Sequence, residues 1–175
     1  MTRGVFVDQK SAIDRFQFSP VGYLRTPFSE TNEIPKGLGA QHLAEGRLEV
    51  LPEYALGLKD IGGFSHLYIL WVFHRAKSAQ LLCSPPSDNR EHGVFATRAP
   101  VRPNPIGLTL VKLLRVEGTT LYLEGVDMLD HTPVLDIKPC LSGVSSAELN
   151  RGWLAEAESR ALKNEEPIPP SETQP

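Results

Sequence analysis

The stretch that decides the fold is Leu67-Tyr-Ile-Leu-Trp-Val-Phe73, which is rich in aromatic and β-branched side chains. Apolar residues occupy both alternating sets of positions, a pattern typical of a short strand that is buried on two sides in a barrel or a sandwich. The stretch is much shorter than the ~20 apolar residues that a membrane-spanning helix needs. It therefore predicts a central strand of a β-protein.

Other short strands are predicted on both sides of this segment. Residues 106–128 alternate about the turn Glu117-Gly-Thr-Thr120 and predict a hairpin, whose first strand has Ile106, Leu108, Leu110 and Leu114 on one face. Three more strands are predicted at residues 21–24, 46–51 and 93–97. About six short strands joined by Pro and Gly turns favour a barrel over a parallel α/β sheet. The predicted fold class is mostly β, a single barrel-like domain with a C-terminal helix.

Helix is predicted in two places, at residues 52–58 and 145–163. The second begins with a capping box of Ser145 and Glu148 and can break at Gly152. It repeats apolar residues at four-residue spacing, which predicts a stripe that docks on the barrel. The members of this stripe are Leu149, Trp153, Ala157 and Ala161.

Length and composition predict one domain. A chain of 175 residues can bury one core, and its 41% hydrophobic and 22% charged residues are typical of a soluble globular protein. We assign residues 1–16 to a lead-in, 17–163 to the barrel domain and 164–175 to a disordered Pro- and Glu-rich tail. The first 18 residues have no signal-peptide pattern, so a cytoplasmic location is expected.

Charge and cysteine content restrict the possible functions. A net charge of -3 means that any contact with RNA must be local, and residues 90–115 offer a patch of five cations against the single acid Glu91. Cys83 and Cys140 are predicted to be free thiols, since they have no metal-ligand spacing. No metal is expected, and no phosphate-loop, zinc-protease or serine-hydrolase motif occurs in the sequence.

Residues 93–107 carry the first group of candidate functional side chains. Pro100, Pro103 and Pro105 restrict the backbone, so Arg98, Arg102 and Asn104 would be presented on a stiff loop. The planar guanidinium of Arg is suited to carboxylate or phosphate groups. The alternative is a structural role, in which these side chains brace the loop through backbone carbonyls.

Residues 126–139 carry the second group. Three carboxylates, a His and a Lys lie at the mouth of the predicted hairpin, where acids can accept hydrogen bonds from ribose hydroxyls or from an amino group. Alternatively, the carboxylates stabilise turns by bonding their own backbone. A third group lies at the ends of the strand 67–73, where His74 beside Arg75 is a better ligand-binding candidate than His66.

These segments resemble the TsaA-like family (YaeB-like barrels). Its best understood members are the TrmO enzymes, which methylate N6 of threonylcarbamoyladenosine at position 37 of tRNA. The resemblance runs from residue 20 to residue 139 and is most specific in two strings, Arg102-Pro-Asn-Pro-Ile-Gly-Leu108 and Thr132-Pro-Val-Leu-Asp-Ile-Lys-Pro139. It implies a barrel of short strands, a homodimer, and an S-adenosylmethionine site near the subunit interface.

The resemblance also implies which residues hold the cofactor. They are Pro35, Lys36, Gly37, His74, Arg75, Arg98, Leu108, Asp127, Met128, Leu129 and Asp130. The chain departs from the family at Pro35-Lys-Gly37, where many members have Pro-Arg-Gln, and it ends soon after the core, whereas longer members carry a further domain.

Methyl transfer to a ureido-conjugated N6 requires the loss of a proton, and Asp130 and Asp136 are the candidate catalytic acceptors. Arg102, Asn104 and Lys138 are the candidate substrate contacts. Two alternatives remain: methylation of a small metabolite by the same cofactor, and a non-catalytic barrel that binds an adenosine ligand.

Overall fold

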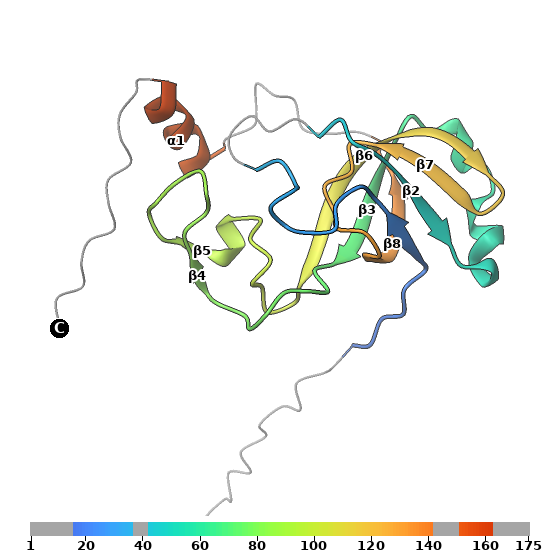
Figure 1. Ribbon diagram of the computed structural model, residues 1–175, viewed down its shortest axis with the longest axis horizontal. Helices are drawn as coiled ribbons and strands as arrows, with labels where there is room; N and C mark the ends of the chain where they lie inside the picture. The colour runs from blue at the N-terminus through green and yellow to red at the C-terminus, as the bar shows by residue number, and fades with distance from the viewer. Residues whose placement is uncertain (1–15, 37–41, 142–150, 163–175) are drawn as a thin grey trace, which may run out of the picture.

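The computed structural model describes residues 16–36, 42–141 and 151–162. Six strands close into an antiparallel barrel (Figure 1). Around the barrel the order is β1 (Gly22–Arg25), β2 (Glu45–Val50), β7 (Thr120–Glu124), β6 (Ile106–Glu117), β3 (His66–Val72) and β8 (Pro133–Pro139). The predicted mostly-β barrel with a C-terminal helix is confirmed. The domain boundaries at residues 16 and 163 stay a prediction.

The barrel core is built by alternation along each strand. On β3, Leu67, Ile69 and Trp71 point inward and are at most 7% exposed. On β6 the inward set is Gly107, Thr109, Val111 and Leu113, so the predicted apolar face of this strand is its outer face. The side chains there, Ile106, Leu108, Leu110 and Leu114, are 36% to 49% exposed.

Two of the predictions for the strands are wrong. Residues 93–97 do not form a barrel strand: β5 (His92–Gly93) pairs with β4 (Leu82–Cys83) in a separate small sheet, and η3 (Val94–Ala96) is a 3-10 turn. The barrel takes its sixth strand from β8, in the segment whose polar residues suggested a turn. β8 begins and ends with a proline, at positions where a strand tolerates the missing N–H donor.

The helical segments match the prediction in part. Residues 52–58 form the 3-10 helix η1 (Pro52–Leu58), which is followed by η2 (Ile61–Gly63). α1 spans Trp153–Leu162, so it starts later than predicted, while the expected capping box and Leu149 lie outside the described residues.

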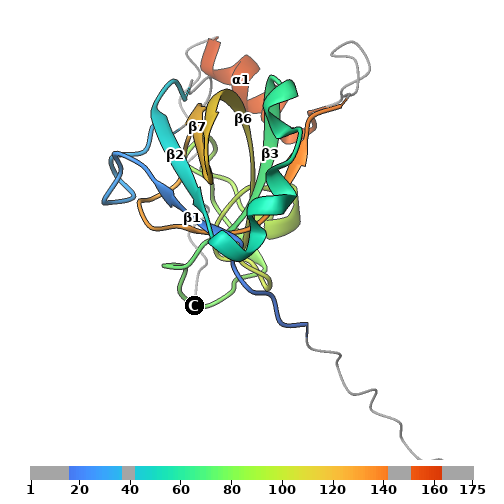
Figure 2. The same cartoon turned by 90° about the vertical axis from the view of Figure 1, so that its right-hand side faces the viewer.

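The docking site of α1 also differs from the prediction. α1 lies beside the β4–β5 segment and away from the barrel strands in Figure 1, whereas in the turned view of Figure 2 it lies behind the barrel. The Trp153 ring stacks on His92 with 4.1 Å between ring centroids, and its Nε1 donates to the Ala96 carbonyl at 2.8 Å. These two contacts join the first residue of α1 to His92 on β5 and to Ala96 on η3.

Asp88 ties α1 to the β4–β5 segment. Its side chain is 4% exposed and accepts hydrogen bonds from Arg90 Nη2 at 2.8 Å and from Arg160 Nη2 at 2.6 Å. The hydrogen bonds from Arg90 and the nearby charge of Arg160 hold the pKa of this carboxyl well below its usual range. The ionised form is therefore favoured by the folded state.

The substitution Asp88→Asn is expected to lower the free energy of unfolding at pH 7 by about 2 kcal/mol, because charge-assisted hydrogen bonds are lost. A carboxylate with a lowered pKa stabilises the fold above its unfolded pKa of about 4, and this contribution disappears as the pH falls further. In urea unfolding, the difference in unfolding free energy between the wild type and Asp88→Asn should be smaller at pH 3 than at pH 7. The control Glu53→Gln on η1 should change the unfolding free energy little at either pH. An advantage of equal size at both pH values would contradict this role of Asp88.

Candidate functional site

A cavity of about 370 Å³ opens where β7 leaves β6. The ladder between these strands covers residues 112–117 of β6 and stops at Glu124, because Gly125 adopts a φ of 93° that diverts the chain. Within the described residues, no strand pairs with that edge of β6 at residues 106–111. The cavity size falls in the range of small-molecule sites. Its lining is His42, Tyr68, Arg98, Leu108, Thr109, Leu110, Gly125 and Asp127.

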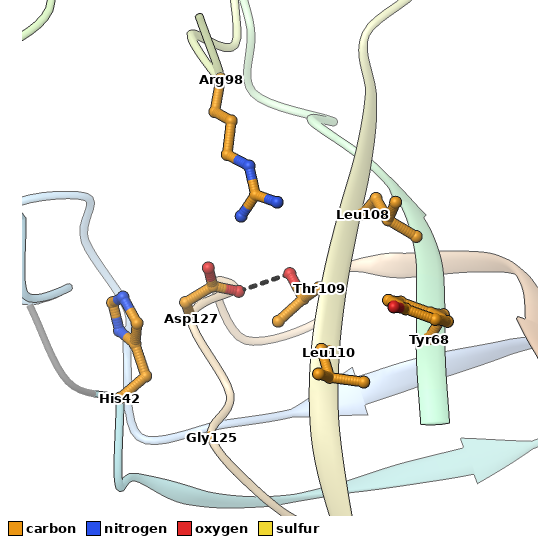
Figure 3. A pocket seen from close by; sticks show the side chains of 8 residues that line it. All are labelled: His42, Tyr68, Arg98, Leu108, Thr109, Leu110, Gly125 and Asp127. Carbon is orange, nitrogen blue, oxygen red and sulfur yellow. Dashed lines mark hydrogen bonds between the residues drawn. The ribbon is translucent and has the colours of Figure 1, made fainter. Parts of the chain in front are cut away.

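A cation and a carboxylate face each other across this cavity. Figure 3 shows Arg98 extending from the loop after η3 toward Asp127, which follows β7. Within the described ranges Arg98 forms no hydrogen bond or ion pair, whereas Asp127 Oδ1 accepts a 2.7 Å hydrogen bond from the Thr109 hydroxyl. The proline-rich loop and the acidic segment therefore both contribute a side chain to this cavity.

The remaining walls were not predicted from the sequence, apart from Leu108. Leu108 and Leu110 project from the outer face of β6, and Tyr68 on β3 is the strand partner of Leu110. They give the cavity an apolar side that suits a flat ring. His42 Nδ1 is buried there and has no hydrogen-bond partner among the described residues. A ligand atom would satisfy it.

Residues 127–130 connect this cavity to a second group of predicted residues. The Met128 carbonyl accepts a hydrogen bond from the Thr26 hydroxyl at 2.8 Å, and Asp130 Oδ1 accepts one from the Thr26 backbone N–H at 3.1 Å. Asp130 N–H donates in turn to the Phe28 carbonyl. Met128 and Leu129 are buried, so their side chains pack in the protein and do not face the cavity. The segment thus fixes the loop that leads to residues 35 and 36.

His74 and Arg75 contact the same region from the end of β3. Arg75 Nη1 donates to the Ser29 carbonyl at 2.9 Å, and His74 Nδ1 lies 3.5 Å from the Thr132 hydroxyl. Burial lowers the pKa of His74, and the nearby charge of Arg75 acts in the same direction. At neutral pH this imidazole is therefore uncharged.

The predicted cofactor residues fall into two joined groups. Arg98, Leu108 and Asp127 line the cavity. The other predicted cofactor residues that the structure describes lie on or next to the loop of residues 26–36. Pro35 and Lys36 are exposed at the end of this loop, and Gly37 lies outside the described residues.

The predicted catalytic and substrate residues do not line the cavity. Arg102 Nη1 donates to the carbonyls of Val94 and Thr97, at 3.2 and 2.8 Å, so this side chain braces the loop that carries Arg98. Lys138 pairs with Asp136 at 2.7 Å on the outer face of β8, and Asn104 is exposed. Their roles in the reaction, like that of Asp130, stay predictions.

Among the described residues, no helix is long and apolar enough to cross a membrane. In the same ranges, no cluster of three or more His, Cys, Asp or Glu side chains is arranged to hold a metal ion. Cys83 and Cys140 are free thiols.

Known proteins share this sequence and architecture. Residues 23–146 match the family described as tRNA-methyltransferase O N-terminal domain. A probable S-adenosyl-L-methionine-binding protein of Pyrococcus abyssi is 46% identical over 138 residues, covering 78% of this chain and 75% of its own length. Human tRNA (adenine(37)-N6)-methyltransferase is 44% identical over 141 residues, covering 74% of this chain and 31% of its own length. The crystal structure of TrmO from Pseudomonas aeruginosa superposes with a TM-score of 0.65 at 38% identity.

A closed antiparallel barrel with one C-terminal helix places the chain in the class of mostly-β barrel proteins. More particularly, the chain belongs to the tRNA-methyltransferase O N-terminal domain family, which confirms the resemblance found in the sequence. The superposition on the Pseudomonas aeruginosa structure includes 79% of this chain but only 62% of that solved chain.

Proposed function

We propose that this protein binds S-adenosylmethionine in the 370 Å³ cavity and transfers its methyl group to N6 of the adenine at position 37 of tRNA. The observation that carries the proposal is the uncommitted Arg98 guanidinium opposite Asp127, beside an apolar wall. The cation suits a ligand carboxylate, the acid suits ribose hydroxyls or an ammonium group, and the apolar wall suits adenine. The names of relatives in Pyrococcus abyssi and human support the same cofactor and reaction.

The cofactor supplies a methyl group that its sulfonium has already activated, so the protein needs no nucleophile of its own. Its residues must instead align the acceptor nitrogen and exclude water, tasks for which Tyr68, Leu108 and Leu110 are suited. The acceptor nitrogen loses a proton, and we retain Asp130 and Asp136 as the candidate acceptors. The Thr26 N–H fixes one oxygen of Asp130, which would orient it for this step.

The finer assignment concerns the substrate. We propose threonylcarbamoyladenosine as the acceptor nucleoside, with Arg102, Asn104 and Lys138 near the RNA and the reaction taking place in the cytoplasm. Because the net charge is -3, binding would depend on a local patch of cations. Lys36 and Gly37 replace residues common in the family, and the methionine carboxylate or the threonyl carboxylate is the expected partner of Arg98.

We also propose a homodimer. The outer face of β6 exposes the apolar side chains of Ile106, Leu108, Leu110 and Leu114, with Lys112 between the last two, and Leu108 and Leu110 also line the cavity. A second copy covering this face would remove apolar surface from water and bring the cofactor site close to the interface. A monomeric mass by light scattering at micromolar concentration would contradict the pairing.

The proposed reaction is testable with purified protein, S-adenosylmethionine and tRNA that lacks the modification. We expect mass spectrometry of the digested tRNA to show the N6-methylated threonylcarbamoyl nucleoside, and S-adenosylhomocysteine to form in equal amount. tRNA affinity should fall steeply between about 50 and 200 mM salt, because phosphate contacts release counterions.

Other outcomes would identify the alternatives. Cofactor binding with no S-adenosylhomocysteine from any RNA would indicate a non-catalytic binding barrel. Turnover on a small acceptor, without salt dependence and without modified tRNA, would indicate a metabolite methyltransferase.

A further inference from the structure

Two hydrogen bonds in series connect the barrel core with the cavity. Trp71 on β3 and Thr109 on β6 are both only 7% exposed, and Trp71 Nε1 donates to Thr109 Oγ1 at 3.0 Å. The Thr109 hydroxyl donates in turn to Asp127 Oδ1 at 2.7 Å (Figure 3). The carboxylate in the cavity is thus held by a core residue that lies beneath it.

The direction of this chain is fixed by chemistry. An indole N–H can only donate, so Thr109 Oγ1 must accept from Trp71. The single hydroxyl hydrogen is then free to point to Asp127, which needs no proton of its own. Figure 3 shows the other carboxylate oxygen on the side that faces Arg98. One oxygen is therefore committed to the core, and the other is available to a ligand.

The two hydrogen bonds of Thr109 are not needed for filling the core. Thr109 is the inward residue of β6 between Gly107 and Val111, where an apolar side chain would fit the barrel. Burying a hydroxyl there costs desolvation free energy unless the hydroxyl itself makes hydrogen bonds. This hydroxyl satisfies Trp71 and orients Asp127 at the same time.

We propose that Thr109 is a positioning residue for ligand binding, which acts through Asp127. The inference rests on the proposed function, since it assumes that S-adenosylmethionine occupies the cavity. Thr109 lines the cavity, but its hydroxyl is already bonded to Trp71 and Asp127, so in this scheme it acts on the ligand through Asp127. It sets the rotamer of the carboxylate before the ligand arrives, which lowers the ordering cost of binding.

The test compares a substitution that removes the hydroxyl with one that keeps it. Thr109→Val keeps the shape but removes the hydroxyl, and we expect the Kd for S-adenosylmethionine, measured by calorimetry, to rise about 10-fold. Thr109→Ser keeps the hydroxyl and should stay within about 2-fold of the wild type. A serine variant that binds as weakly as the valine variant would overturn the inference.

A double-mutant cycle separates positioning from a general effect on the fold. If Thr109 acts through Asp127, Thr109→Val should cause no further loss of affinity in an Asp127→Ala background. The chain has two tryptophans, so its proton–nitrogen NMR spectrum shows two indole signals. Thr109→Val should shift the Trp71 signal and leave that of Trp153 in place, which reports an intact fold.

The outcomes distinguish this inference from the proposed function. If Asp127→Ala weakens binding but Thr109→Val does not, or if the two losses are additive, the positioning role is wrong and the proposed function stands. If the wild-type chain does not bind S-adenosylmethionine at all, the proposed function is wrong and the inference falls with it.

Discussion

Replacing Arg98 with alanine is expected to raise the Kd for S-adenosylmethionine about 100-fold, because a desolvated charge pair with the ligand would be lost. Since Arg98 forms no ion pair or hydrogen bond within the described part of the chain, its removal should leave the thermal unfolding temperature nearly unchanged. Calorimetry with the purified variant measures the first quantity, and a thermal melt measures the second.

Two controls sharpen this experiment. Arg98→Lys keeps the charge but loses the planar fork, so its Kd should lie between those of wild type and alanine. Arg47→Ala removes an exposed cation on β2, outside this cavity, and should leave the Kd unchanged. Equal Kd values for Arg98→Ala and wild type would remove Arg98 from the site.

Replacing Gly107 with alanine is expected to cost about 3 kcal/mol of unfolding free energy, since overpacking a rigid core forces side chains out of their preferred rotamers. A Cβ built at Gly107 would overlap the six-membered ring of Trp71, its strand partner on β3. This ring cannot swing away freely, because its Nε1 is bound to Thr109 and it contacts Phe73 with 4.2 Å between ring centroids.

A matched control is available on η1. A Cβ at Gly57 would meet no atom within 4 Å, so Gly57→Ala should leave stability unchanged or raise it slightly. Urea unfolding of both variants measures the difference. Equal stability of Gly107→Ala and wild type would mean that the Trp71 ring can repack at little cost.

The sequence predicts the barrel well because its core strands carry local signals. The run of apolar residues at β3 and the alternation along β6 identify both strands within a few residues. The same alternation cannot say which face is inward, and here the face with four large apolar side chains lies outside. Position 107 faces inward, and the Trp71 ring of the neighbouring strand leaves no room there for a side chain, which is a long-range contact that no local pattern contains.

The candidate site was predictable only where its residues carry a chemical signal. Arg98 and Asp127 were found because a cation on a proline-rich loop and an acid near a strand end are unusual in a plain barrel. His42 and Thr109 were missed, since each becomes a site residue only when distant segments close around the cavity. β8 was missed because the polar residues of the segment 126–139 were interpreted as turn-forming or ligand-binding groups, whereas Asp136 and Lys138 project from the outer face of the barrel.

The early departure of β7 from β6 at Gly125 has a consequence for how the protein tolerates sequence change. A strand edge without a neighbour presents amide hydrogens and carbonyl oxygens at regular intervals. These groups belong to the main chain, so they are the same for any residue except proline at positions 107–111. A ligand that bonds to them would be recognised by a feature that most point mutations leave in place, and drift in the surrounding side chains would then alter selectivity more readily than it abolishes binding.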